Sequence, residues 1–90
     1  MKKQVNVIYK GRVQGIGFRF TVESIANKLG VCGWVKNLKD GNAEIMAEGE
    51  KENLEKFLKE VNSYFSNYIS DTEVFWFSAT GKFKDFTIEF

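Results

Sequence analysis

The chain has 90 residues, of which 43% are hydrophobic and 16% aromatic, and its 13 basic and 12 acidic residues leave a formal net charge of +1. This length predicts a single compact domain over residues 1–90. The even mixture of charges argues against a general nucleic-acid binder, which needs a strongly basic field, but leaves room for one small anion pocket.

The residue types that the chain lacks exclude several chemistries. There is no His, and Cys32 is the only cysteine. Catalysis that depends on His and sites with His-ligated metals are therefore excluded, and one thiol cannot form an internal disulfide. We expect a cytoplasmic protein without a metal or other cofactor. The polar start from Met1 to Asn6 does not resemble a signal peptide, and no apolar run approaches the ~18 residues of a membrane span.

The first third of the chain predicts a strand, a loop and a helix. Residues alternate between apolar and polar from Gln4 to Lys10, which is typical of a strand. Gly11 to Phe18 contains three glycines and predicts a loop. From Thr21 to Leu29, apolar residues recur at i, i+3, i+4 and i+7, which predicts a helix with one face in the core. Gly30 is suited to end that helix.

The middle of the chain predicts a hairpin and a second helix. Strands are predicted over Val31 to Leu38 and Ala43 to Glu48, and Lys39 to Asn42 contains the Asp-Gly pair of a tight turn, with its aspartate as a turn residue. These two strands should pair antiparallel. Helical spacing of apolar residues then resumes from near Glu50, and this second helix frays within Asn62 to Tyr68.

Two aromatic and β-branched runs follow, Glu73 to Ala79 and Phe83 to Phe90, separated by a turn at Gly81. The resulting order, βαββαβ with room for an extra final strand, predicts an α+β fold of the ferredoxin-like type. In this two-layer sandwich, two helices cover one face of an antiparallel sheet. The run from Val74 to Phe77 would be prone to aggregation at a sheet edge. The fold alone does not decide function.

The segment GRVQGIGFR joins the first strand to the first helix. A glycine-rich loop at a helix N-terminus can direct backbone N–H groups at an anion, and Arg19 adds a charged planar fork that matches phosphate oxygens. The alternative is a tight connection with a solvated Arg19, and the spacing alone leaves both open. Arg12 is assigned to the surface.

Asn37 lies at the end of a predicted strand, just before the hairpin turn. Its amide can accept a hydrogen bond from a water and donate one to a substrate. The alternative is that Asn37 stabilises the turn. Both roles remain open on position alone.

Together, the two segments resemble the acylphosphatase family. GRVQGIGFR is similar to the family signature G-x-V-Q-G-V-x-F-R, and GWVKNLKDGNAEIMAEG is similar to a second motif, G-W-V-x-N-x-x-D-G-x-V-E. The similarity runs from Val7 to about Leu58. It implies that Arg19 is the catalytic residue that binds phosphate and that Asn37 orients the attacking water. It further implies that a cradle for the phosphoryl oxygens is made by the backbone amides of Gln14, Gly15, Ile16, Gly17 and Phe18.

The implied activity is metal-independent hydrolysis of carboxyl-phosphate mixed anhydrides to a carboxylate and phosphate, so the expected partner is a small-molecule acyl phosphate, with no nucleic acid and no membrane. A monomer is the default. The chain departs from the family pattern at Ile16 and Ala43, and at Phe20, which we expect to pack; it also lacks a Gly-Pro between Ser63 and Thr72.

Three alternative functions are compatible with a domain of this size and topology. An RNA-binding module of the same topology is disfavoured because Ile16 and Thr21 stand where aromatic residues would stack on bases. A stand-alone copy of the acylphosphatase-like domain of carbamoyl-transfer maturation proteins is disfavoured because no zinc-binding cysteine clusters follow. An interaction domain without catalysis is the remaining alternative.

Overall fold

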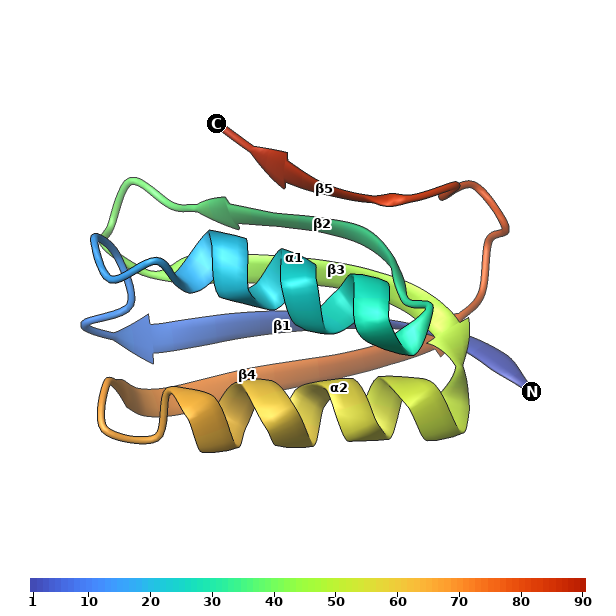
Figure 1. Ribbon diagram of the computed structural model, residues 1–90, viewed down its shortest axis with the longest axis horizontal. Helices are drawn as coiled ribbons and strands as arrows, with labels where there is room; N and C mark the ends of the chain where they lie inside the picture. Colours follow the sequence, from blue (N-terminus) through green and yellow to red (C-terminus); the bar gives the residue numbers. More distant parts are fainter.

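The computed structural model describes residues 1–90 and contains five strands and two helices. In chain order these are β1 (Lys2–Gly11), α1 (Phe18–Leu29), β2 (Cys32–Asn37), β3 (Ala43–Glu50), α2 (Lys51–Tyr64), β4 (Ile69–Ser78) and β5 (Phe86–Glu89). Figure 1 shows that both helices lie on the same side of the sheet. The ferredoxin-like two-layer sandwich is therefore confirmed. No helix has the length and apolar character needed to span a membrane.

The sheet has the order β4-β1-β3-β2-β5. The first four strands are antiparallel to their neighbours, as predicted, but β5 pairs parallel with β2. The prediction of a wholly antiparallel sheet is therefore wrong for the last strand. After β4, residues 79–85 carry the chain from one edge of the sheet to the other (Figure 1), so β5 pairs with β2 rather than with β4.

The core lies between the sheet and the two helices. Val5, Val7 and Tyr9 of β1 are buried on the side of the sheet that faces the helices, as the alternating pattern of that strand predicts. The helices contribute the stripes predicted from their spacing, which are Val22, Ile25 and Ala26 from α1 and Leu54, Phe57 and Val61 from α2. In all, 18 buried apolar residues form one cluster, so the whole sandwich shares one core.

Glycines in the left-handed region bound α1. Gly30 ends the helix at φ 68°, and its N–H faces the carbonyls of Ala26 and Asn27, as predicted for a C-terminal cap. The helix begins at Phe18 rather than at the predicted Thr21, because the N–H of Thr21 already donates to the carbonyl of Gly17 at 3.0 Å. The glycine-rich loop, which is the candidate phosphate-binding segment, therefore leads directly into α1.

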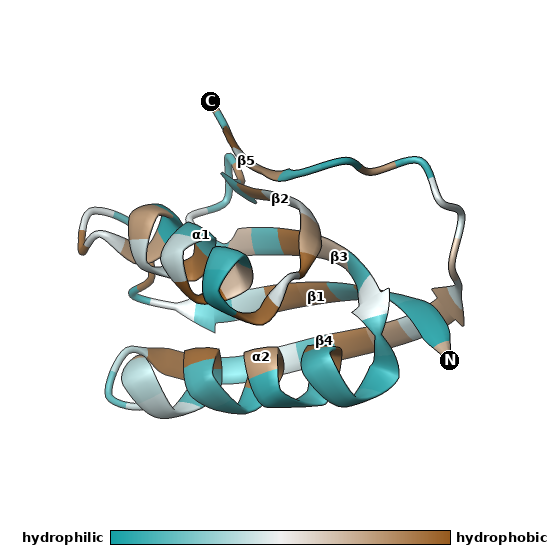
Figure 2. Cartoon of the chain, turned by 45° about the vertical axis from the view of Figure 1, so that its right-hand side comes forward, coloured by the Kyte–Doolittle hydropathy of each residue, from teal (hydrophilic) through white to brown (hydrophobic).

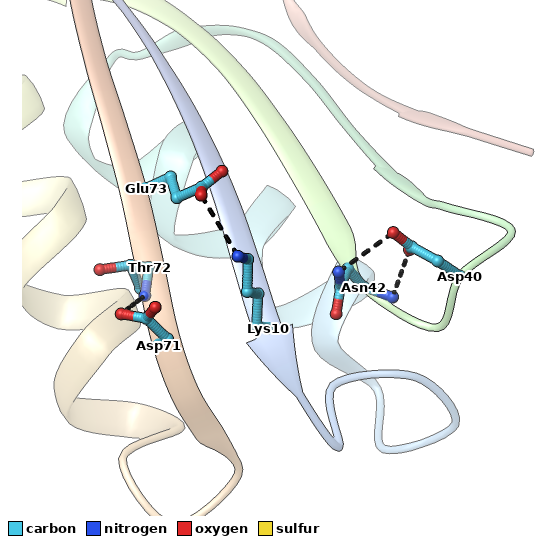
Figure 3. Close-up of polar contacts among 6 residues, drawn as sticks. All are labelled: Lys10, Asp40, Asn42, Asp71, Thr72 and Glu73. Atoms are coloured by element: carbon cyan, nitrogen blue, oxygen red, sulfur yellow. Dashed lines mark hydrogen bonds and ion pairs between the residues drawn. The ribbon is translucent and has the colours of Figure 1, made fainter.

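The β2–β3 hairpin closes through Asp40. Its carboxylate accepts the backbone N–H of Asn42 at 3.0 Å and the Asn42 side-chain amide at 3.2 Å (Figure 3). Asp40 is thus a turn residue, as predicted. Within β2, Gly33 has φ 137°, and a Cβ at this position would lie 1.9 Å from the carbonyl oxygen of Met46, so β2 and β3 can pair this closely only with glycine there.

Glu48 anchors the segment that crosses from β4 to β5. Its buried carboxylate accepts the backbone N–H groups of Thr80 and Gly81, and the Gln4 side chain donates to it at 3.4 Å. Burial is the largest influence and raises the pKa of Glu48, but the hydrogen bonds from Thr80, Gly81 and Gln4 together bring it below its ordinary value. The ionised carboxylate therefore stabilises the crossing segment.

Strand β4 forms one edge of the sheet, paired only with β1. An ion pair of 3.2 Å between Lys10 and Glu73 links the two strands on the surface (Figure 3). The four residues from Val74 to Phe77 are between 42% and 51% exposed, and the hydrophobic colour of the second half of β4 is visible in Figure 2. This apolar run therefore lies on an edge strand, the position in which the sequence predicts that it is prone to aggregation.

Candidate active site

The candidate site lies at the end of the sandwich where β1 runs into the glycine loop and β2 ends (Figure 1). A pocket of about 180 Å³ at this end is lined by Val13, Gly15, Gly17, Phe18, Arg19, Phe20 and Asn37. The two side chains singled out from the sequence, Arg19 and Asn37, are thus brought into one pocket although they come from different elements.

The loop offers its backbone to the pocket. Gly15 and Gly17 both have φ 78°, and no atom lies within 4 Å of where their Cβ would be, so glycine serves the backbone conformation here rather than relieving a clash. Val13 is fully buried and fastens the loop to the core. None of the N–H groups from Val13 to Phe20 donates to a protein acceptor. Free N–H groups at a helix N-terminus suit an anion. Of the predicted cradle, Gly15, Gly17 and Phe18 line the pocket, whereas Gln14 and Ile16 do not.

The Gln14 side chain ties the loop to the β2–β3 hairpin. Its Nε2 donates to the carbonyl of Leu38 at 2.8 Å and to the carbonyl of Asn42 at 3.0 Å. The resemblance to the family implies a role only for the backbone amide of Gln14. The glutamine in the first motif was the available signal, but its partners follow from tertiary structure.

Strand β5 holds the Arg19 guanidinium. Nη1 donates to the carbonyl of Glu89 at 3.2 Å, and the guanidinium carbon lies 4.7 Å from the centroid of the Phe90 ring. Arg19 is half-buried and neither contact is with a carboxylate, so the guanidinium keeps its charge available for an anion in the pocket. Glu89 and Phe90 could not be predicted as contacts of Arg19, since no sequence motif joins them to the loop.

Asn37 is the last residue of β2 and pairs with Ala43. Its Oδ1 is buried and has no hydrogen-bond partner in the protein. Asp40 rather than Asn37 caps the turn, so the structural alternative for Asn37 loses its main support. A buried acceptor without a partner is costly in a folded protein, and this one lies beside the pocket where it can accept from a water or a ligand.

Two further positions differ in outcome. Phe20 was expected to pack, but its side chain is 63% exposed, because it lies on the side of α1 that faces away from the core. Arg12 is exposed, as predicted.

No group of three or more His, Cys, Asp or Glu side chains is arranged to hold a metal ion. The pocket itself combines one guanidinium with N–H donors and has no carboxylate in its lining.

Comparison with known proteins points to one family. The acylphosphatase family model matches residues 5–88. An acylphosphatase of Bacillus licheniformis is 42% identical over 89 residues, which are 97% of this chain and 98% of that protein. The crystal structure of acylphosphatase from Bacillus subtilis superposes with a TM-score of 0.89 at 35% identity, covering 98% of this chain and 99% of that one.

The fold also occurs inside a larger protein. Full-length HypF, in its phosphate- and nucleotide-bound form, matches 99% of this chain with a TM-score of 0.81 and 27% identity, but the match covers only 12% of HypF. The B. licheniformis and B. subtilis proteins, by contrast, match this chain over almost their whole length.

Proposed function

The chain belongs to the acylphosphatase family of hydrolases, and on that premise we propose that Arg19 binds the phosphoryl group of an acyl phosphate while Asn37 orients the water that attacks it, without a metal ion. The observation that carries this proposal is the unpartnered, buried Oδ1 of Asn37 beside a pocket that Arg19 also lines. The pocket thereby offers an acceptor for water and donors for phosphate within one small volume.

The leaving group explains how so few side chains suffice. A carboxylate whose conjugate acid has a pKa of roughly 4 leaves without a proton at neutral pH, so no general acid is needed. What remains is to offset charge on the phosphoryl oxygens and to hold water in line with the bond that breaks. Arg19 and the loop N–H groups do the first, Asn37 does the second, and a phosphoryl oxygen takes the proton from water.

Two properties of the reaction follow. The rate of acyl phosphate hydrolysis should stay flat across neutral pH and should not change in EDTA, since the mechanism uses no general acid or base of the protein and no metal ion. Alkyl phosphate monoesters should be poor substrates, because an alkoxide leaving group needs an acid. A sharp titration of kcat near pH 7, or fast hydrolysis of an alkyl monoester, would contradict the mechanism.

The test is release of phosphate from benzoyl phosphate in EDTA by the wild type and by Arg19→Ala and Asn37→Ala. We expect both variants to be folded by circular dichroism and to lose about two orders of magnitude or more in kcat. The matched control is the same arginine-to-alanine substitution at the exposed Arg12, Arg12→Ala, which should leave kcat unchanged. Full activity in either site variant would overturn the assigned role.

The monomeric state, the cytoplasmic location and the single domain over residues 1–90 stay predictions. Both helices pack into the shared core, so no spare apolar helix is left to favour self-association, which supports the monomer. Sedimentation equilibrium at micromolar concentration tests it, and a dimer mass would contradict it.

A further inference from the structure

The largest hollow on the molecule is not the phosphate pocket but a groove between α1 and α2. Its volume is about 590 Å³, within the range of pockets that hold small organic molecules. Phe20 and Ile25 of α1 and Tyr64 of α2 supply its apolar lining, while Lys28 and Glu60 form an ion pair across it. The groove is therefore apolar in part and closed by a polar contact two turns along α1 from Phe20.

The groove adjoins the phosphate pocket. Phe20 lines both hollows, and it lies one residue after Arg19. Tyr64 ends α2 at the same end of the sandwich at which α1 begins (Figure 1). Phe20 and Tyr64 are 63% and 67% exposed, so both rings are free to contact a ligand. An exposed aromatic ring by itself is ordinary, but Phe20 is a residue that lines both hollows, which makes the two neighbours.

The direction of the reaction points to the groove. In phosphoryl transfer the attacking and leaving oxygens lie roughly in line on opposite sides of phosphorus. Asn37, which orients the water, belongs to the sheet layer, whereas Phe20 lies on the side of α1 turned away from that layer. A leaving carboxylate opposite the water therefore points away from the sheet, toward Phe20 and the groove.

We propose that the groove between α1 and α2 is the subsite for the acyl group, in which Phe20, which also lines the phosphate pocket, and Tyr64, which lines only the groove, select aromatic acyl phosphates over short aliphatic ones. This inference rests on the proposed function. It names the part of the substrate that the phosphate pocket does not read, since Arg19 and the loop N–H groups contact only the phosphoryl oxygens. Aromatic acyl groups gain ring-to-ring contact that an acetyl group lacks.

The test compares kcat/KM for acetyl phosphate, benzoyl phosphate and 4-phenylbutanoyl phosphate in the wild type, Phe20→Ala and Tyr64→Ala. In Phe20→Ala, the benzoyl-to-acetyl ratio of kcat/KM should fall about ten-fold. In Tyr64→Ala, the ratio for the longer substrate should fall similarly, with a smaller change for benzoyl phosphate. Phe75→Ala, which removes an exposed ring from β4, is the matched control and should change neither ratio.

The outcomes separate the two hypotheses. If the wild type hydrolyses the acyl phosphates but both ratios stay unchanged in both variants, the acyl subsite is wrong and the proposed function stands. If the Phe75→Ala control changes the ratios as much as the groove variants, the effect is not local and the subsite is equally refuted. If the wild type hydrolyses none of the three, the proposed function fails and the subsite fails with it.

Discussion

Replacing Gln14 by alanine should release the glycine loop from the β2–β3 hairpin, and the structure limits how much stability the protein can lose through this change. The change removes the two hydrogen bonds that Gln14 donates to the carbonyls of Leu38 and Asn42. Both carbonyls keep a second donor, the N–H of Gly41 for Leu38 and the N–H of Leu38 for Asn42, so neither is left without a partner. The loss is then about 2 kcal/mol in the free energy of unfolding, from two net hydrogen bonds at about 1 kcal/mol each.

The same loss of about 2 kcal/mol also limits how far kcat/KM can fall. If all of the lost energy had held the loop in its binding conformation, kcat/KM would fall by about thirty-fold and no more, since a population shift cannot exceed the free energy behind it. Gln14→Glu should be worse than Gln14→Ala, because it sets a carboxylate against two carbonyl oxygens. Urea unfolding and kcat/KM for benzoyl phosphate, measured on the same samples, give the two quantities.

Asn6 provides a matched control. Its side-chain amide also donates two hydrogen bonds, to Glu44 Oε2 at 2.9 Å and to the carbonyl of Ile45 at 3.1 Å, on the sheet face away from the helices. Asn6→Ala should lose comparable stability and keep its kcat/KM. Equal losses of activity in Asn6→Ala and Gln14→Ala would refute the link between loop and hairpin. A loss well beyond a hundred-fold in folded Gln14→Ala would mean that Gln14 contacts the reacting atoms.

Three other changes have expected outcomes. The buried hydroxyl of Tyr9 has no partner, so Tyr9→Phe should raise the free energy of unfolding by up to about 1 kcal/mol; a lower urea midpoint would contradict this. The pKa of Glu48 is lowered in the folded state, so the ionised carboxylate stabilises the folded protein fully above the ordinary pKa of 4.5. This stabilisation is lost as the pH falls through the lower pKa of the folded state. The difference in urea midpoint between wild type and Glu48→Gln should therefore shrink in acid. Phe90→Ala removes a cation–π contact worth about 0.5–1 kcal/mol at an exposed site and should lower kcat/KM by at most about five-fold, far less than Arg19→Ala; an equal loss in both would show that the ring does more than hold the guanidinium.

The parts of the fold that sequence predicts best are those fixed by local periodicity. The strand around Val7, the helical stripe that contains Ile25 and the Asp-Gly hairpin all depend on residues close in the chain. The parallel pairing of β5 does not, since residues 79–85 carry no pattern that says which edge they approach. With β1 between β3 and β4, both β2 and β4 have a free edge, and only the path of residues 79–85 across the sheet decides that β5 pairs with β2.

The candidate site likewise has a part that the sequence predicts and a part that depends on tertiary structure. The motifs pointed to Arg19 and Asn37 without showing that they share a pocket, which requires the loop and the end of β2 to meet. Phe20 was misjudged because hydrophobicity alone does not tell which side of a helix a residue occupies when the helix begins three residues earlier than expected. The contact of Arg19 with Glu89 spans 70 residues, and no local signal announces it.

The place of β5 at the free edge of β2 has a consequence for how the molecule loses activity. A strand of four residues with a single neighbouring strand makes fewer ladder hydrogen bonds than the rest of the sheet, and only its first residue, Phe86, is buried in the core, so its end at Glu89 can open first. Its carbonyl at Glu89 is the protein's own contact for the Arg19 guanidinium. Heating should therefore inactivate the enzyme through opening of the end of β5, at a temperature where most backbone amides of the protein are still protected from exchange with solvent.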